Sequence, residues 1–325
     1  MTTPAPVLAV NDLAVHFGGR KRWLQAAPRP VRAVDGVSFA IARGETLALV
    51  GESGCGKSTV SNAILGLVPV TRGSIGVADR EIAGAGSAAL RDIRAHVQLV
   101  FQDPQLSLNP RMSVGTAIAE PLLVRGLAAG TDLARRVGDL MNAVGLRPEH
   151  ATRYPHQFSG GQRQRVVIAR ALALEPDLVV CDEPVSALDV SVRAQILNLL
   201  ARLQRERGIA YLFISHDLGV VRHIADRIAV MYLGRLVEVA TRDQLFSAAK
   251  HPYSKALLSA VPEPDPARQR AKARIVLAGE LPSPSNVPRG CAFHTRCTIA
   301  TEICRSVRPE LSSRSDGAAV ACHHA

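Results

Sequence analysis

A glycine-rich segment near the start of the chain has the residue types and the spacing of a phosphate-binding loop. It reads Gly51-Glu52-Ser53-Gly54-Cys55-Gly56-Lys57-Ser58-Thr59 and fits the pattern G-x-x-x-x-G-K-[ST]. The glycines let the backbone turn so that several N–H groups face one point, and a helix beginning there adds the positive end of its dipole. A triphosphate is the matching ligand. Lys57 is expected to hold its β- and γ-phosphates, and the Ser58 hydroxyl is expected to coordinate Mg²⁺.

Two adjacent carboxylates, Asp182 and Glu183, follow the apolar run Leu178-Val179-Val180-Cys181. Parallel sheets present functional residues at the C-terminal ends of their strands. Asp182 is expected to reach Mg²⁺ through its water shell, and Glu183 to orient or deprotonate an attacking water. Such a pair can also serve only to place negative charge at the start of a helix. Because a phosphate loop is present in the same chain, we favour the catalytic interpretation.

The elements that must position these residues are indicated by short apolar runs at residues 47–50, 97–101, 178–181, 210–215 and 228–232. Their length and composition are typical of strands buried on both faces. Segments with helical spacing separate them, and this alternation predicts a mostly parallel sheet with crossover helices.

Two changes of pattern suggest the domain organisation. Residues from about 105 to 176 are rich in Ala, Leu and Arg at helical spacing, which predicts an inserted helical part. After residue 250 prolines become dense, which indicates a linker and a loop-rich tail. We expect a nucleotide-binding domain over residues 1–250 and a C-terminal extension over residues 251–325.

Composition narrows the function classes. The chain has 325 residues, of which 47% are hydrophobic and only 4% aromatic, and its formal net charge is +11. That charge could reflect nucleic acid, an anionic membrane surface or a solvated basic surface. Few aromatics lie between the basic clusters at 20–22 and 268–274 to stack bases, so we favour a solvated surface and expect no nucleic-acid partner. We see neither a signal peptide nor an apolar run of about 18 residues, and expect the chain to stay in the cytosol.

A third motif begins at Phe158 and reads FSGGQRQR before the apolar run VVIARALAL. It resembles the signature of the ATP-binding cassette (ABC) family. Ser159 and the glycine amides that follow it would form a second anion-binding nest at a helix start, which one chain cannot bring to its own phosphate loop. In the family, two subunits meet head to tail and enclose two ATP molecules. The resemblance therefore assigns to the ATP site, besides the phosphate loop residues Gly51, Ser53, Gly54, Cys55, Gly56, Lys57, Ser58 and Thr59, the signature residues Ser159, Gly160, Gly161 and Gln162.

Further family elements appear in the expected order. By resemblance, Gln102 senses Mg²⁺ and the transmembrane subunit, Asp189 couples the two ATP sites, and His216 contacts the γ-phosphate. Phe17, at the end of the first predicted strand, is the candidate for stacking on adenine, although it could instead be a core residue. The implied catalytic residues are Lys57, Gln102, Glu183 and His216, and the implied Mg²⁺ ligands are Ser58, Gln102 and Asp182.

The same resemblance implies the fold and narrows the branch. It implies an α/β P-loop NTPase fold, an ABC ATPase domain whose mostly parallel sheet carries an antiparallel β subdomain and an inserted helical subdomain, followed by a small loop-rich C-terminal domain. The segments FQDP at 101–104, CDEPVSALDV at 181–190 and HPYSKALLSAVPEP at 251–264 resemble those of oligopeptide and dipeptide importers. The insertion GGRKRWLQAAPRP at 18–30 resembles the second of the two ATPases in such systems.

This branch implies a heterodimer with a related ATPase, two membrane-spanning permeases that contact the segment from Gln102 to about Val114, and an extracytoplasmic binding protein that chooses the peptide. The subunit would then lie peripherally on the cytoplasmic face of the inner membrane. Import of nickel or another small solute is an alternative, because related machinery carries such solutes. Less favoured are a non-transport ABC ATPase acting on nucleic acid or ribosomes, and a regulatory module that hydrolyses little ATP.

Six cysteines raise separate questions. Cys291, Cys297, Cys304 and Cys322 cluster in the tail, where a cytosolic protein is not expected to hold stable disulfides. Their spacing lacks a tight C-x-x-C pair and leaves three interpretations open, namely a [4Fe-4S] cluster, a zinc site helped by His294, His323 or His324, and free thiols. A [4Fe-4S] cluster is what a resemblance to some dipeptide-importer ATPases implies.

Cys55, in the phosphate loop, allows two interpretations of its own. The helix dipole and Lys57 could lower the pKa of its thiol and make it reactive enough for alkylation to inhibit ATP binding. It could equally be a small residue that the loop tolerates, and this second interpretation is the one we prefer.

Overall fold

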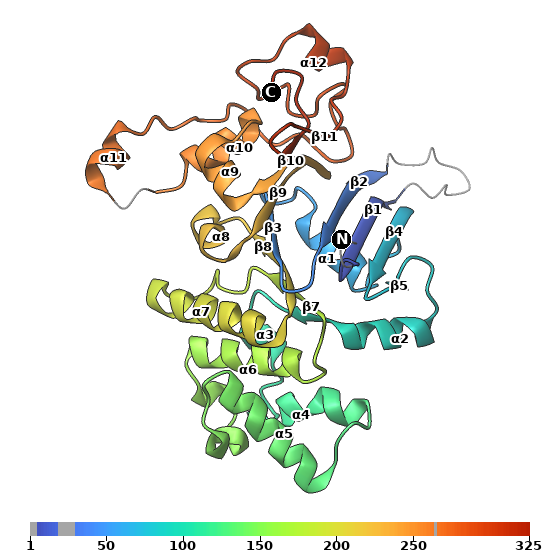
Figure 1. Ribbon diagram of the computed structural model, residues 1–325, viewed down its shortest axis with the longest axis vertical. Coiled ribbons are helices and arrows are strands. Elements are labelled where there is room, and N and C mark those ends of the chain that lie inside the picture. Colours follow the sequence, from blue (N-terminus) through green and yellow to red (C-terminus); the bar gives the residue numbers. More distant parts are fainter. Residues whose placement is uncertain (1–4, 19–29, 263–264) are drawn as a thin grey trace.

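The computed structural model describes residues 5–18, 30–262 and 265–325 (Figure 1). The insertion at 18–30, with its basic cluster at 20–22, lies almost entirely outside these residues. Within them the strands form two sheets. No helix in these ranges is both long and apolar enough to cross a bilayer.

The larger sheet has the strand order β11-β12-β10-β9-β3-β8-β7-β6. Its centre is parallel, since β9, β3, β8, β7 and β6 all run the same way, and the five apolar runs of the sequence form these strands. These strands consist of apolar residues because helices cover both faces of the sheet and bury nearly every side chain. The bounds are β3 (Thr46–Val50), β6 (Val97–Val100), β7 (Leu178–Asp182), β8 (Ala210–Ser215), β9 (Arg227–Tyr232), β10 (Arg235–Thr241), β11 (Ser312–Ser313) and β12 (Ala319–Val320).

The smaller sheet is antiparallel and has the order β2-β1-β4-β5. It consists of β1 (Leu8–Phe17), β2 (Val31–Ile41), β4 (Arg72–Val77) and β5 (Arg80–Glu81). Its apolar side shares one buried cluster with β3 and the helix after it. Phe17 is the last residue of β1, an inner strand of this sheet, and pairs with Val31 at the start of β2.

The helices fall into three groups along the chain. Those that flank the sheets are α1 (Lys57–Ile64), α2 (Ser87–His96), α7 (Val190–Arg207), α8 (Leu218–Ile224) and α9 (Arg242–Ala248). A helical lobe at one end of the molecule (Figure 1) contains α3 (Pro104–Ser107), α4 (Val114–Val124), α5 (Gly130–Ala143), the 3₁₀ turns η1 (Pro148–Thr152) and η2 (Pro155–Gln157), and α6 (Gly160–Leu172). The C-terminal part adds α10 (Pro252–Ser259), α11 (Pro266–Ala271) and α12 (Glu302–Ser306).

The C-terminal part packs on the main sheet rather than standing apart from it. Strand β12 pairs with β10, where Glu238 lies opposite Val320. The C-terminal part thus adds strands beside β10 and widens the sheet. Phe293 from the tail is 1% exposed and packs edge-on against Tyr232 at the end of β9, with ring centroids 5.2 Å apart. The loop-rich C-terminal segment has few apolar residues of its own, and it is therefore stabilised by packing against the core of the larger domain.

The predicted fold class is confirmed. A mostly parallel sheet carries an antiparallel sheet and an inserted helical lobe, in an α/β arrangement with the nucleotide-loop motif after a central strand.

Candidate active site

The phosphate loop, residues 51–59, connects the central strand β3 to α1, and two of its glycines are required by geometry. Gly51 and Gly56 have φ angles of 156° and 109°. A Cβ atom on Gly51 would lie 2.2 Å from the Met231 carbonyl oxygen, and one on Gly56 would lie 2.2 Å from the Ala33 carbonyl oxygen. No side chain fits at either place. The loop can therefore fold tightly under the N-terminal end of α1 only with glycine at these positions.

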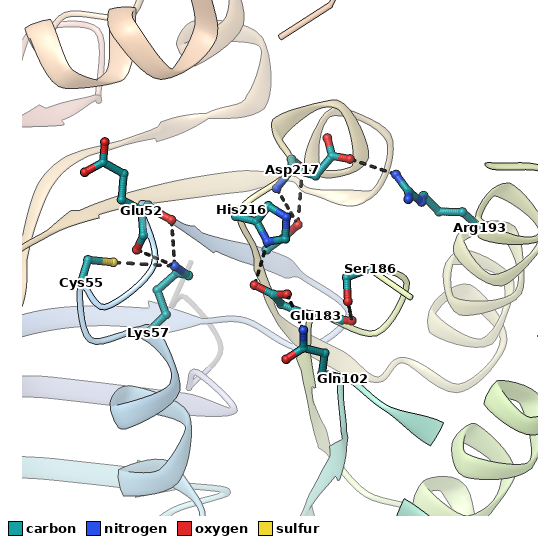
Figure 2. A network of polar contacts seen from close by, with 11 residues as sticks. Glu52, Cys55, Lys57, Gln102, Glu183, Ser186, Arg193, His216 and Asp217 are labelled. Atoms are coloured by element: carbon teal, nitrogen blue, oxygen red, sulfur yellow. Dashed lines mark hydrogen bonds and ion pairs between the residues drawn. The ribbon is translucent and has the colours of Figure 1, made fainter. Parts of the chain in front are cut away.

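Lys57 begins α1 and is only 7% exposed. Its Nζ donates to the carbonyl oxygens of Gly51, at 2.8 Å, and Glu52, at 3.0 Å, as the dashed lines in Figure 2 show. The ammonium is thus held inside the turn of the loop. No side chain caps the start of α1, so no capping side chain occupies the first N–H groups of this helix, which are available to a ligand.

A cavity of about 720 Å³ opens at the loop, which is a usual size for a site that holds a small-molecule ligand. Among the described residues, its lining combines the loop, the strand ends and one residue from the C-terminal part. The lining residues are Phe17, Val31, Ala33, Ser53, Gly54, Gly56, Lys57, Ser58, Thr59, Gln102, Asp182, Glu183, His216 and Pro284. Parallel strands that end at one edge of the sheet bring β6, β7 and β8 side chains to the loop after β3.

Glu183 follows β7 and is the centre of a polar network (Figure 2). One of its carboxylate oxygens accepts a hydrogen bond from Nδ1 of His216 at 2.8 Å, and the other accepts one from Nε2 of Gln102 at 3.0 Å. Its φ of 49° is uncommon for a residue with a side chain. The left-handed backbone turns the carboxylate toward the end of β8 and the residue after β6, so three strand ends converge on one carboxylate.

Asp182 lies beside the loop and is hydrogen-bonded to the side chain of Ser58. Burial raises the pKa of its carboxyl above the usual value, although the hydrogen bond from Ser58 and the charge of Lys57 oppose that rise. A hydroxyl and a carboxylate side by side are hard oxygen donors, of the kind that Mg²⁺ takes together with phosphate oxygens and water. These two residues therefore fit a Mg²⁺ ion that is bound with a nucleotide.

Phe17 is 41% exposed at the end of β1 and lines the cavity together with Val31 and Ala33 of β2. These three residues give the cavity an apolar wall. Pro284 adds to this wall from the C-terminal part, and its carbonyl oxygen accepts the N–H of Arg32 at 3.1 Å. Sequence patterns did not single out Pro284, because only the tertiary fold brings residues so distant along the chain together.

The signature residues are fully described by the structure, and none of them lines this cavity. Ser159 is exposed and caps α6: its hydroxyl accepts the N–H of Gln162, and the Gln162 side chain accepts the N–H of Ser159. This capping box fixes the start of the helix. Asp189, at the start of α7, is also exposed. Ser159, Gln162 and Asp189 are therefore presented on the surface, outside the cavity at the phosphate loop of their own chain.

The structure distinguishes between the two interpretations of Cys55. Its side chain is 1% exposed, and burial raises the pKa of the thiol, which the nearby Lys57 lowers only in part. Desolvation of a thiolate outweighs the attraction of one ammonium here. The interpretation of Cys55 as a small packed residue fits this geometry, and the reactive-thiol interpretation does not.

The four tail cysteines gather in one region without closing around an ion. Burial raises the pKa of Cys291, and the charges of Cys304, Cys297 and Cys322 raise it further, which reflects their proximity. The Cys304 sulfur also lies 3.4 Å from Nε2 of His324. Across the described ranges, however, no group of three or more His, Cys, Asp or Glu side chains is arranged to hold a metal ion.

Comparison with known proteins identifies the family. Residues 34–186 match the family model described as ABC transporter, and residues 237–304 match that described as the C-terminal region of oligopeptide/dipeptide transporters. The chain is 52% identical over 308 residues to the oligopeptide transport ATP-binding protein OppF of Salmonella typhimurium, covering 94% of this chain and 92% of the relative. It is 51% identical over 321 residues to the di/tripeptide transport ATP-binding protein DppF of Pseudomonas aeruginosa, covering 98% of both.

Solved structures give the same result. A subunit of the ABC transporter complex cbiONQ of Clostridium perfringens matches with a TM-score of 0.65 at 27% identity, over 75% of this chain and 91% of that one. A dimeric ATP-binding cassette in a post-hydrolysis state with ADP and Pi matches with a TM-score of 0.63 at 28% identity, over 72% of this chain and 98% of that one. The chain is therefore an ABC ATPase, and it belongs to the ATP-binding subunits of ABC transporters that carry the oligopeptide and dipeptide transporter C-terminal region.

Proposed function

We propose that this chain hydrolyses ATP in a head-to-tail dimer of ATP-binding subunits and that hydrolysis powers the import of di- or oligopeptides. The observation that supports the proposal is sequence identity. About half of the residues, over nearly the whole chain, are identical to those of subunits named for oligopeptide and di/tripeptide transport. The match extends into the C-terminal region, which is not part of the ABC transporter family model.

In the proposed reaction, Glu183 accepts a proton from the attacking water as the water oxygen bonds to the γ-phosphorus and the bond to the bridging oxygen of ADP breaks. The two hydrogen bonds to the Glu183 carboxylate hold it in place. Lys57 stays against the β- and γ-phosphates, and His216 contacts the γ-phosphate. Mg²⁺, held by Ser58 and Asp182 with Gln102 nearby, would neutralise phosphate charge.

The remaining contacts to ATP are proposed to come from a second subunit. Ser159 and Gln162 are exposed at the start of α6, and the capping box uses their N–H groups but not those of Gly160 and Gly161. The N–H groups of these two glycines would donate to phosphate, and Asp189 would lie at the junction. The dimeric relative with ADP and Pi supports this arrangement. Similarity to OppF and DppF supports a heterodimer with a related ATPase as the finer proposal.

A groove between the sheet and the helical lobe is the proposed permease contact. It has a volume of about 320 Å³ and is lined by residues of both parts, including Leu67, Phe101 and Pro121. Leu67 and Phe101 are 57% and 47% exposed, so an apolar helix face from a permease would cover them. Phe101 precedes Gln102, which contacts Glu183, so a partner seated here is linked to the ATP site. The subunit would then lie on the cytoplasmic face of the inner membrane, with an extracytoplasmic binding protein that supplies the peptide.

For residues 251–325, the proposed C-terminal extension, a [4Fe-4S] cluster on Cys291, Cys297, Cys304 and Cys322 is the finer proposal. Four thiols in one region suit such a cluster chemically, and its ligands lie further apart than those of a single ion. Anaerobically purified protein should show a broad absorbance near ~400 nm and contain iron. Zinc without iron would support the zinc alternative. If the protein contains neither metal, the four cysteines are free thiols.

Co-purification tests the transport proposal. The chain should associate with two permeases and a second ATPase, and the ATPase rate of this complex should rise with the binding protein and a transported peptide. Failure to associate with any permease would contradict import. Stimulation by a nickel complex and by no peptide would contradict a peptide substrate while leaving the ATPase reaction intact.

A further inference from the structure

The C-terminal part of the chain contacts the phosphate loop through a two-pronged ion pair. Arg296, in the tail, donates to both carboxylate oxygens of Glu52, in the loop, at 2.7 Å and 3.1 Å. The Arg296 side chain is only 8% exposed, and that of Glu52 is 29% exposed. A bidentate guanidinium–carboxylate pair shielded from water is among the stronger and more directional polar contacts in proteins. The tail therefore restrains Glu52 in both position and orientation.

A second contact from the C-terminal part holds the backbone of the same residue. The N–H of Glu52 donates to the hydroxyl of Tyr253, in α10, at 2.8 Å. Tyr253 is fully buried and packs against Phe293, with ring centroids 5.4 Å apart. Phe293 also accepts the N–H of Arg296 at its carbonyl oxygen, at 3.0 Å. Both contacts to Glu52 are thus anchored in one buried aromatic group.

Glu52 in turn contacts the lysine of the loop. Its carbonyl oxygen accepts a hydrogen bond from Nζ of Lys57 at 3.0 Å, and Figure 2 shows the Glu52 carboxylate directed away from that ammonium. The Glu52 carboxylate therefore binds Arg296, while the Glu52 carbonyl oxygen binds Lys57. Fixing Glu52 at its carboxylate and its N–H limits where its carbonyl, and hence the ammonium, can lie.

We propose that Arg296 is a positioning residue of the ATP site, which sets the place of the Lys57 ammonium through Glu52, with Tyr253 as its backbone counterpart. The C-terminal part then belongs to the nucleotide site of its own chain. This proposal rests on the role proposed above for Lys57. A purely structural ion pair would stabilise the fold without acting through Lys57, and the two cases give different results in a double-mutant cycle.

The experiment measures MgATP affinity of the full-length chain with a fluorescent ATP analogue, for Arg296→Met, Lys57→Met and the double variant. Losing a charge-assisted bidentate pair should weaken MgATP binding about tenfold in the Lys57 background. In the Lys57→Met background, Arg296→Met should cost less than about twofold, since the affected group is already absent. Arg305→Met is the matched control, because Arg305 is exposed in the same tail and should change nothing.

Arg296→Lys keeps the charge but not the fork, so it should fold and show an intermediate loss; thermal unfolding confirms that each variant is folded. An equal loss in the Lys57 and Lys57→Met backgrounds would overturn the proposal, and so would wild-type affinity in Arg296→Met. If Lys57→Met itself keeps wild-type affinity, the role proposed for Lys57 falls and the role of Arg296 falls with it. Association with permeases is a separate readout, so failure of the transport proposal does not alter these results.

Discussion

Substituting alanine at two glycines of the phosphate loop should have very different effects, although the two lie only two residues apart. Gly54 has a φ of 80°, and a Cβ atom there would meet nothing within 4 Å. Gly56 has a φ of 109°, and a Cβ atom would lie 2.2 Å from the Ala33 carbonyl oxygen and 2.8 Å from Cε of Met231. The Met231 methyl can move, but the carbonyl belongs to the backbone of β2.

The magnitudes follow from these contacts. Gly54→Ala should lower the free energy of unfolding only by the strain of a left-handed backbone, about 1–2 kcal/mol. Gly56→Ala adds a similar strain and must also displace either β2 or the loop. Overpacking of this kind costs a further ~1–3 kcal/mol. We therefore expect Gly56→Ala to lose about 2–5 kcal/mol of unfolding free energy. At roughly 2–4 °C per kcal/mol, the Tm of Gly56→Ala should lie several degrees below that of Gly54→Ala.

Thermal unfolding without nucleotide measures this difference, and a fluorescent ATP analogue measures the accompanying loss of MgATP affinity. Gly56→Ala should be impaired in both measurements, because displacing the loop also moves its N–H groups. Equal Tm values for the two variants would refute the reasoning, since both carry a similar backbone strain and only Gly56→Ala adds a steric overlap. The same would hold if Gly56→Ala bound MgATP as tightly as Gly54→Ala.

Three further predictions concern single side chains. Glu183→Gln should lower the ATPase rate by about 10²–10⁴-fold while MgATP binding persists, and size-exclusion chromatography with MgATP should show a trapped dimer; unchanged hydrolysis would contradict the role of Glu183. Burial lowers the pKa of His251 from 6.5 to about 4, so the unfolded chain takes up a proton first and stability should fall by up to about 3 kcal/mol as pH drops from 6.5 to 4. His251→Asn can still accept the N–H of Tyr253 and should flatten that fall in a series of Tm measurements against pH. The buried Cys55 thiol should resist iodoacetamide at neutral pH until the chain unfolds, as mass spectrometry would show; rapid labelling of folded protein would contradict its burial.

Local sequence signals were sufficient for the main sheet and for the loop. The strands β3, β7, β8 and β9 are short apolar runs buried on both faces, and few other structures accommodate such runs at that length. The loop motif between β3 and α1 required glycine at fixed positions for steric reasons, so its conformation could be predicted. The sequence left two interpretations of Cys55, with the packed residue preferred, because the burial that raises the pKa of its thiol depends on how the loop packs in the whole fold.

The sequence by itself determined which residues are the catalytic candidates, because the chemistry needs particular residue types and the motifs place them at the ends of predicted strands. Their convergence was decided by tertiary structure: Glu183, His216 and Gln102 contact one another because β6, β7 and β8 end at one sheet edge. The contact of Arg296 with Glu52 joins residues 244 positions apart. Such pairs carry no periodicity or spacing, since long-range contacts depend on how the whole chain packs, and only the folded structure could reveal that the C-terminal part reaches the phosphate loop.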